Sequence, residues 1–211
     1  MTLVNKKIKN IIFDWSGVIS DDHKTVYLTG FKMVESLGEN FISYERFKEE
    51  FSLPYMTFWE KYLPGKTKKE LDSLFAFYYK KVEPPIIIPD AGLTVKILAK
   101  NYHLAVLSSH ITKEIKSEAE RYGIGDCFKK IHGNIHNKIK AIKKVLKYNE
   151  FKPDETVYVG DMRHDIQAGK AANIKTIAVI SDYEGLEKLV EEKPDFIIGR
   201  ISSLLQILQY L

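Results

Sequence analysis

The sequence predicts an α/β protein in which a doubly wound parallel sheet carries an inserted α-helical cap. Three observations lead to this fold class: an isolated apolar run near the start of the chain, a long segment with helical but no strand pattern, and a second half in which both patterns alternate. Such alternation is typical of parallel sheets covered by helices on both faces. The 211 residues are enough for one domain with a smaller insert.

The first apolar run, residues 7–13, is expected to be a strand of this sheet. Asp14 ends the run and Gly17 follows closely, which is typical of a polar turn after a strand. We expect the core to comprise residues 1–20 and 85–211, and the cap to comprise residues 21–84.

The cap segment has the apolar spacing of amphipathic helices, and Pro54 and Pro64 separate the later ones. The helices expected there are 24–37, 43–51, 55–62 and 68–82. Aromatic residues of this segment recur at helical spacing, so we expect them to pack in the core of the cap. The alternative is that they line a substrate cleft. They are Phe51, Tyr55, Phe58, Trp59 and Tyr62, with Pro54 among them.

Prolines 84, 85 and 89 mark the return of the chain to the sheet, after which strand and helix patterns alternate. The strands expected in this half are 103–107, 127–135, 156–159, 175–180 and 195–198. The helices expected are 93–100, 113–122, 138–148, 165–172, 185–192 and 202–210. Helices should therefore cover both faces of the sheet.

Composition excludes several classes of protein. A hydrophobic share of 45% with 28% charged residues is ordinary for a globular domain. The net charge is only +4 and the lysines are scattered among acidic residues, so we expect no nucleic-acid partner. No stretch approaches the ~18 apolar residues of a membrane span, so we expect no membrane association. Cys127 is the only cysteine, so no disulfide can form within the chain, and we expect a cytoplasmic location. The chain is expected to be a monomer or a homodimer.

Polar residues follow three of the expected strands directly. They are Asp14, Ser108 with Ser109, and Asp161 with Asp165 shortly after it. Ligands bind beyond the carboxyl ends of the strands in open parallel sheets, so these residues should meet at one edge. A single aspartate there is explained as a turn former or helix cap, but the set is not.

Carboxylates gathered at one edge repel each other and lose solvation unless a hard cation holds them together. We therefore predict a Mg²⁺ site formed by Asp14 and Asp161, with Asp165 as a further ligand. Ser108 and a nearby lysine would bind phosphate oxygens by hydrogen bond and by charge. A carboxylate beside the metal is also a competent nucleophile for phosphoryl transfer through an aspartyl phosphate.

Four segments in this order resemble the motifs of the haloacid dehalogenase-like (HAD) hydrolase superfamily. They are residues 13–18 (Phe-Asp-Trp-Ser-Gly-Val), residues 106–109 (Val-Leu-Ser-Ser), Lys138, and residues 159–165 (Val-Gly-Asp-Met-Arg-His-Asp). The last is the most specific, and a helix rich in small residues, 168–172, follows it. The resemblance spans nearly the whole chain and implies a Rossmann-like core with a C1 cap.

The resemblance also implies roles for the metal-binding residues. Asp14 would be the nucleophile and a metal ligand, and Ser16 would offer its backbone carbonyl to the metal. Asp161 would bind Mg²⁺, and Asp165 would ligate the metal or orient its ligands.

Further roles follow for the residues that would bind the phosphoryl group. Ser108, with Ser109 beside it, would bind that group, and Lys138 would neutralise its charge. Lys140 is the alternative to Lys138 because the proline that usually follows this lysine is absent. A solvated side chain is the other interpretation of either lysine.

One residue departs from the family pattern. Phosphatases of this family carry an aspartate two residues after the nucleophile, which protonates the leaving alcohol, and this chain has Ser16 there. General acid catalysis contributes ~10² to 10⁴ in rate, so hydrolysis of alkyl phosphates should be slow and good leaving groups should be less affected. His23, His110 and His164 are the candidates for a substitute acid.

The sequence thus predicts a Mg²⁺-dependent hydrolase of a small phosphorylated metabolite, similar to phosphoglycolate phosphatases, acting through an aspartyl phosphate. A first alternative is cleavage of carbon-phosphorus or carbon-halogen bonds, because residues 14–17 are similar to the phosphonoacetaldehyde hydrolase motif. That chemistry needs a Schiff-base lysine in the cap, and Lys24, Lys61 and Lys66 are all expected to be solvated. A second alternative is a module that binds metal and phosphate without catalysis.

Overall fold

The computed structural model describes residues 8–211, which divide into two compact units. The core unit comprises residues 8–20 with Ile87–Leu211, and the helical unit comprises Asp21–Ile86. Each is described by itself. The functional division expected from the sequence, a catalytic core of 1–20 and 85–211 with a cap of 21–84, stays a prediction.

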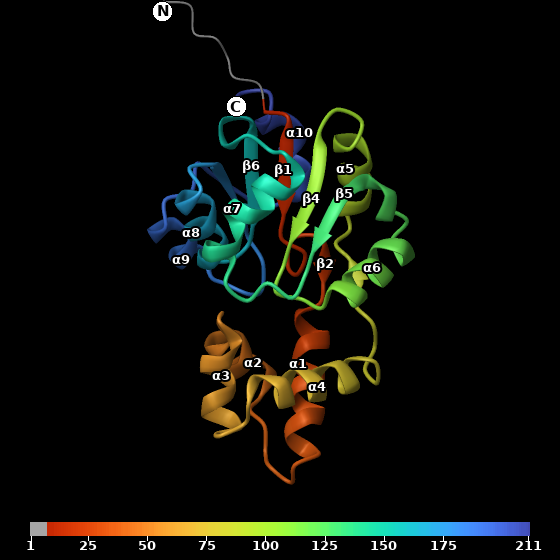
Figure 1. The fold of residues 1–211 in the computed structure, drawn as a ribbon. Helices are drawn as coiled ribbons and strands as arrows, with labels where there is room; N and C mark the ends of the chain where they lie inside the picture. The colour runs from red at the N-terminus through yellow and green to blue at the C-terminus, as the bar shows by residue number, and fades with distance from the viewer. Residues whose placement is uncertain (1–7) are drawn as a thin grey trace, which may run out of the picture. The chain divides into compact units, whose positions relative to one another are not determined.

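The core unit contains a parallel six-stranded sheet in the order β5-β4-β1-β6-β7-β8 among the described residues (Figure 1). Its strands are β1 (Asn10–Phe13), β4 (His103–Leu107), β5 (Phe128–His132), β6 (Thr156–Gly160), β7 (Lys175–Val179) and β8 (Phe196–Ile198). The chain leaves β1 toward β4 and β5 and later returns to its other side for β6, β7 and β8. The predicted doubly wound α/β fold is confirmed. Lys7, predicted to begin the first strand, lies outside the described residues.

Alternate residues of each strand point to opposite faces of the sheet, as the geometry of an extended chain requires. Ile11 and Phe13 belong to one hydrophobic cluster, and Ile12 between them belongs to another. Helices cover both faces (Figure 1), which explains why the strands read as continuous apolar runs. One face carries α5 (Ala91–Leu98), α6 (Thr112–Arg121) and α10 (Leu204–Ile207), and the other carries α7 (Lys138–Asn149), α8 (Arg163–Ala171) and α9 (Leu186–Glu191).

The helical unit has four helices within its described residues: α1 (His23–Glu35), α2 (Tyr44–Glu50), α3 (Tyr55–Tyr62) and α4 (Lys68–Tyr79). Thr67 starts α4 with a capping box, in which its side chain and that of Glu70 bond to each other's backbone N–H. The aromatic residues of α3 pack into this unit's core, with Phe58 and Trp59 both buried. For these two residues the core environment is confirmed.

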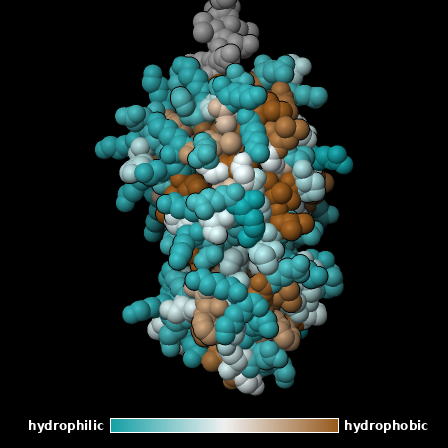
Figure 2. All heavy atoms as spheres, turned by 90° about the vertical axis from the view of Figure 1, so that its right-hand side faces the viewer, coloured by the Kyte–Doolittle hydropathy of each residue, from teal (hydrophilic) through white to brown (hydrophobic). Residues whose placement is uncertain are grey.

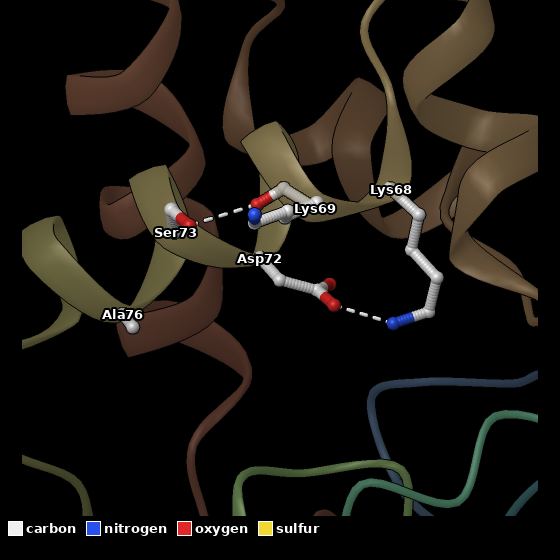
Figure 3. A pocket seen from close by; sticks show the side chains of 5 residues that line it. All are labelled: Lys68, Lys69, Asp72, Ser73 and Ala76. Carbon is white, nitrogen blue, oxygen red and sulfur yellow. Dashed lines mark hydrogen bonds and ion pairs between the residues drawn. The ribbon is translucent and has the colours of Figure 1, made fainter.

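An open hollow lies along α4 and is lined by Lys68, Lys69, Asp72, Ser73 and Ala76 (Figure 3). Lys68 forms an ion pair with Asp72, and the Ser73 hydroxyl donates a hydrogen bond to the backbone carbonyl of Lys69. Lys68 and Asp72 therefore offset each other's charge at the hollow.

Several elements differ from the sequence-based expectation. Two strands of two residues each, β2 (Ser20–Asp21) and β3 (Ile86–Ile87), form a separate small sheet and are too short to leave a periodic pattern. The helix expected at 202–210 is instead a 3₁₀ turn, Ile201–Ser203, followed by the short α10. Other 3₁₀ turns are Gly125–Cys127, before β5, and Pro153–Glu155, before β6.

The surface carries mainly hydrophilic side chains on the face shown in Figure 2, with hydrophobic ones in separate patches. Within residues 8–211, no helix has the length and apolar character that crossing a membrane requires.

Candidate active site

Three neighbouring strands end at the same edge of the sheet and deliver the predicted polar residues there. Asp14 follows β1, Ser108 follows β4 and Asp161 follows β6. The last residue of β1, Phe13, pairs in register with Val106 of β4 and with Val159 of β6. The Asp14 backbone N–H donates to the Val159 carbonyl at 2.8 Å, so the ladder holds the first residue beyond β1 as well.

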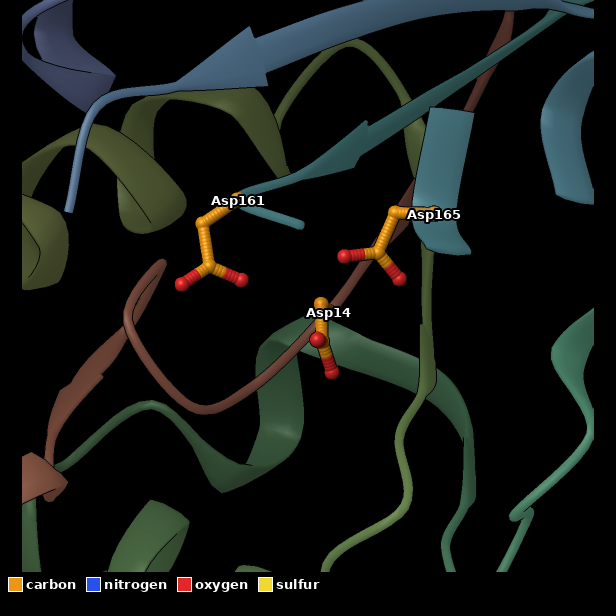
Figure 4. A group of neighbouring side chains, drawn as sticks. All are labelled: Asp14, Asp161 and Asp165. Atoms are coloured by element: carbon orange, nitrogen blue, oxygen red, sulfur yellow. The ribbon is translucent and has the colours of Figure 1, made fainter. Parts of the chain in front are cut away.

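Asp14, Asp161 and Asp165 form an acidic cluster at this edge (Figure 4). Each offers a carboxylate oxygen, and these oxygens all lie within 4.8 Å of one another. The residues are only 4%, 1% and 1% exposed, respectively. Asp165 lies in the first turn of α8, which begins two residues after Asp161 and turns the chain back toward the sheet edge.

Two glycines allow the carboxylates to approach so closely. Gly17 has a positive φ of +70°, and a Cβ atom there would lie 2.0 Å from Asp161 Oδ2. A Cβ atom at Gly160 would lie 2.3 Å from the Asp165 Cβ. Any other residue at either position would displace a member of the acidic cluster.

Lys138 completes the cluster from the first turn of α7. Its side chain is fully buried, and Nζ lies 2.5 Å from Asp14 Oδ2 and 2.6 Å from Asp165 Oδ1. Burial alone would lower the pKa of Lys138, but the two carboxylates raise that pKa above its ordinary value. Lys140 is exposed, and its backbone N–H bonds to the Asn137 side chain that caps α7.

One lysine would not balance three ionised carboxylates. Burial raises the pKa of Asp14, an effect that Lys138 partly offsets and Asp165 increases. Burial, with the nearby Asp14 and Asp165, holds the pKa of Asp161 well above its ordinary value. Asp161 Oδ1 is buried and has no hydrogen-bond partner among the described residues. The cluster offers buried carboxylate oxygens, one of which has no hydrogen-bond partner among the described residues. Hard divalent cations prefer such oxygen ligands, so these residues fit one.

Two further side chains hold the cluster, and the sequence analysis missed both. The Ser181 hydroxyl donates to Asp161 Oδ2 at 2.6 Å, and Tyr158 donates to Asp165 Oδ1 at 2.8 Å. Ser181 lies just beyond β7, so the rule that selected the other strand ends would have found it. Tyr158 lies inside the apolar strand β6. A buried tyrosine hydroxyl usually needs a hydrogen-bond partner, and this was the only feature of the sequence that could have indicated its contact with the cluster.

A comparison with known proteins decides the family. Residues 11–179 match the family described as haloacid dehalogenase-like hydrolase. The chain belongs to this family. The helical unit is that of its C1-capped branch, and we call it the cap from here on.

Relatives of the chain include a phosphoglycolate phosphatase and pyrophosphatases. The chain is 27% identical over 208 residues to phosphoglycolate phosphatase from Aquifex aeolicus, covering 94% of this chain and 95% of that protein. It is 24% identical over 217 residues to pyrophosphatase PpaX from Listeria welshimeri, covering 96% and 97%. A match of 45% identity to PpaX from Anoxybacillus flavithermus spans only 69 residues, 33% of this chain and 32% of that protein. The chain is therefore a HAD-like phosphohydrolase.

Solved structures share the fold at low identity. A haloacid dehalogenase-like hydrolase from Streptococcus pneumoniae has a TM-score of 0.81 at 19% identity, with 96% of this chain and 98% of that one covered. CbbY from Rhodobacter sphaeroides, determined in complex with phosphate, has a TM-score of 0.80 at 14% identity, with 93% and 96% covered. These likenesses show the fold.

The three predicted serines of this HAD-like phosphohydrolase have different hydrogen-bond partners. Ser108 is buried, and its Oγ accepts the His110 backbone N–H at 3.2 Å. The Ser109 hydroxyl donates instead to the Ile135 carbonyl at 3.0 Å. Ser16 is half-buried and forms a β-bridge with Ser20. The structure thus brings Asp14, Asp161, Asp165 and Lys138 into one cluster, and the roles of all seven residues stay predictions.

The candidate substitute acids occupy different surroundings. His110 Nε2 lies 3.3 Å from Glu118 Oε1 in the core unit, and His23 Nδ1 lies 3.0 Å from the Tyr44 hydroxyl in the cap. Burial and the nearby Lys138 lower the pKa of His164.

The lysines considered for a Schiff base belong to the cap. Lys24 and Lys61 are exposed, and Lys61 pairs with Glu50 at 2.5 Å. The expectation of solvation is therefore confirmed for Lys24 and Lys61, whereas Lys66 is half-buried. Cleavage of carbon-phosphorus or carbon-halogen bonds stays a prediction.

Proposed function

We propose that this phosphohydrolase uses Mg²⁺ to hydrolyse a small phosphorylated metabolite through a covalent phosphoryl group on Asp14. The observation that carries the proposal is the approach of the Asp14, Asp161 and Asp165 oxygens to within 4.8 Å of one another, with Lys138 2.5 Å from Asp14. Lysines scattered among acidic residues support a small-molecule substrate over a nucleic acid.

Asp14, Asp161 and Asp165 would hold the metal, with the backbone carbonyl of Ser16 as an additional ligand. The unpartnered Asp161 Oδ1 supports this assignment most directly. When bound, Mg²⁺ supplies positive charge against the transferring phosphoryl group and orients that group for attack. Ser181 would keep Asp161 aimed at the metal by donating to its other oxygen.

In the first step, an Asp14 carboxylate oxygen attacks phosphorus, and the bond from phosphorus to the leaving oxygen breaks, with the electron pair going to that oxygen. In the second, a water oxygen attacks the same phosphorus and the bond from phosphorus to the Asp14 oxygen breaks, with its electron pair restoring the carboxylate. Inorganic phosphate is released, and a proton of the attacking water passes to solvent. The Lys138 ammonium would offset charge on the phosphoryl oxygens in both steps, and the Ser108 hydroxyl would bind one of them. Burial of Lys138 makes its charge more effective there because little water screens it.

Ser16 determines which leaving groups suit this site. A serine hydroxyl does not act as a general acid toward a departing alkoxide at neutral pH. The rate of hydrolysis of alkyl phosphate esters should therefore be lower by a factor of ~10² to 10⁴. Phosphate and phenolate leaving groups depart without this help. A small phosphate ester, as for the relative named phosphoglycolate phosphatase, is the first candidate substrate. Pyrophosphate, as for the relatives named PpaX, is the second, and Ser16 favours it.

The test compares hydrolysis of p-nitrophenyl phosphate with Mg²⁺ and with EDTA, in the wild type and in Asp14→Asn. We expect EDTA to abolish turnover and Asp14→Asn to lower kcat by ~10³-fold or more. Asp195→Asn is the matched control, because Asp195 accepts the Thr176 backbone N–H at the amino ends of the strands, away from the site. Turnover that survives in Asp14→Asn overturns the assignment of the nucleophile.

A second comparison tests the interpretation of Ser16. In Ser16→Asp we expect a gain of ~10² or more for alkyl phosphates and little change for aryl phosphates and pyrophosphate. An equal change for all substrates contradicts a missing general acid.

A further inference from the structure

Glu118, on α6, is a buried carboxylate outside the acidic cluster. Glu118 is only 2% exposed. Its Oε2 accepts the indole N–H of Trp15 at 2.7 Å and the Ser20 hydroxyl at 2.9 Å, and its Oε1 lies 3.3 Å from His110 Nε2. A buried carboxylate is costly unless such donors surround it, and an apolar side chain of similar size would fill this position without that cost. The donors of Glu118 therefore point to a role beyond packing.

One set of these contacts leads to Asp14. Trp15 follows Asp14 in the loop after β1, and its backbone N–H donates to Asp14 Oδ1 at 2.7 Å. The Trp15 ring stacks on Tyr122 with a centroid distance of 6.1 Å and an angle of 11°. By fixing the indole, Glu118 fixes the peptide N–H that orients the Asp14 carboxylate.

The other set leads to Ser108. His110 lies in the loop after β4, and its backbone N–H donates to Ser108 Oγ at 3.2 Å. The His110 carbonyl accepts the Asn134 backbone N–H at 2.8 Å, which holds the same residue from the loop after β5. By bonding to the imidazole, Glu118 fixes the backbone that holds the Ser108 hydroxyl.

We propose that Glu118 is a positioning residue that ties the loop carrying Asp14 to the loop carrying Ser108. This inference rests on the proposed function, in which Asp14 attacks phosphorus and Ser108 binds the phosphoryl group. The two loops follow neighbouring parallel strands that differ widely in sequence position, and the sheet alone sets only the start of each loop. Glu118 sets the distance between the side chains that the loops present, and a displacement of reacting groups by about 1 Å can cost ~10²-fold in rate.

Three variants separate the two sets of contacts. Glu118→Gln weakens both, Trp15→Phe removes the indole N–H while keeping an aromatic ring, and His110→Phe removes the imidazole nitrogens. The readouts are kcat for p-nitrophenyl phosphate and the inhibition constant of inorganic phosphate, which reports binding of the phosphoryl group. Asp195→Asn again serves as the control for loss of a hydrogen-bonded carboxylate elsewhere in the core unit. Thermal unfolding of each variant checks that it is folded.

We expect Glu118→Gln to lower kcat and to raise the inhibition constant of phosphate, each by about tenfold or more. Trp15→Phe should lower kcat with little change in phosphate binding. His110→Phe should weaken phosphate binding and also lower kcat, because Ser108 would hold the phosphoryl group during its transfer as well. Lost stability alone reduces the active fraction, so it lowers kcat in all variants without changing the inhibition constant.

Wild-type values of both constants in folded Glu118→Gln overturn the proposal. If Glu118→Gln does not fold, the other two variants decide. The proposal is overturned if Trp15→Phe and His110→Phe change both constants equally, or if neither variant changes them. Asp14→Asn separates this result from failure of the proposed function. An inactive Asp14→Asn beside an unaffected Glu118→Gln contradicts the role of Glu118 alone, and an active Asp14→Asn contradicts the proposed function.

Discussion

The core unit and the cap place their ion pairs differently. In the core unit, Lys138 is fully buried between Asp14 and Asp165, and Asp161 keeps one buried oxygen without a partner among the described residues. In the cap, the interior is aromatic, and charged pairs such as Arg46 with Glu50 lie at the surface. Buried charge costs stability, whereas the aromatic core contributes to it. The cap is thus organised for packing, and the core unit accepts an electrostatic cost at the edge where the chemistry is proposed.

The comparison is tested most strongly by removing one lysine from each unit. Lys138→Met should lower kcat by ~10² to 10³-fold, because it removes the cation that we propose offsets charge on the transferring phosphoryl group. Without Mg²⁺ it should also lower the free energy of unfolding by about 3–5 kcal/mol, because Asp14 and Asp165 lose their buried partner.

Lys61→Met is the matched variant in the cap. Lys61 is exposed and pairs with Glu50, so kcat should stay at the wild-type value and stability should change by less than ~1 kcal/mol. Steady-state kinetics and urea unfolding measure both effects, and similar changes in the two variants would contradict the contrast between the units.

Two glycines with the same backbone conformation provide the next test. Gly17 in the core unit and Gly38 in the cap have φ values of +70° and +77°. Alanine at either position is strained by about 1 kcal/mol, which urea unfolding measures. Only at Gly17 would the new Cβ meet Asp161 Oδ2, at 2.0 Å; at Gly38 it would meet no described atom within 4 Å.

We therefore expect Gly17→Ala to lower kcat by ~10²-fold and to raise the Mg²⁺ concentration needed for half-maximal activity. Gly38→Ala should keep wild-type kinetics. A wild-type Mg²⁺ dependence in Gly17→Ala would show that Asp161 does not need its observed position.

The smallest expected effect concerns a surface carboxylate of the cap. Hydrogen bonds from Lys61, Tyr62 and Arg46 lower the pKa of Glu50 from 4.5 to about 2. A carboxylate with a lowered pKa in the folded state stabilises that state above its ordinary pKa, and this contribution disappears as the pH falls from 4.5 toward 2. Solvent screens the group, so the contribution should be less than ~1 kcal/mol.

Urea unfolding of the wild type and Glu50→Gln between pH 6 and pH 2 measures it. The wild type should be the more stable at pH 6, and the difference should shrink toward pH 2. A difference that does not vary with pH would contradict the lowered pKa.

The sequence predicted those features that depend on the order of elements along the chain. The alternation of strands and helices specified the parallel sheet, and the carboxyl ends of its strands located Asp14 and Asp161 at one edge. Lys138 and Lys140 could not be distinguished, because the choice depends on where α7 begins. Asn137 caps that helix, which directs Lys138 inward and leaves Lys140 exposed.

Features that depend on tertiary contacts were not predictable in this way. Glu118 contacts Trp15 and His110 only because α6 packs on the sheet beside both loops. Its position in α6 has the polar character of any exposed helix residue, and no local pattern distinguishes it. Ser181 and Tyr158 reach the acidic cluster through the same kind of long-range packing.

The central claim is that Asp14 becomes covalently phosphorylated during turnover. The direct measurement is acid quenching of the wild type during steady-state hydrolysis with Mg²⁺, followed by peptide mass spectrometry, with Asp14→Asn treated in parallel. We expect a phosphoryl group on the peptide containing Asp14 in the wild type, and no such group in the variant or in wild type kept in EDTA. Rapid turnover with that peptide unmodified, or with the phosphoryl group on another residue, would contradict the account.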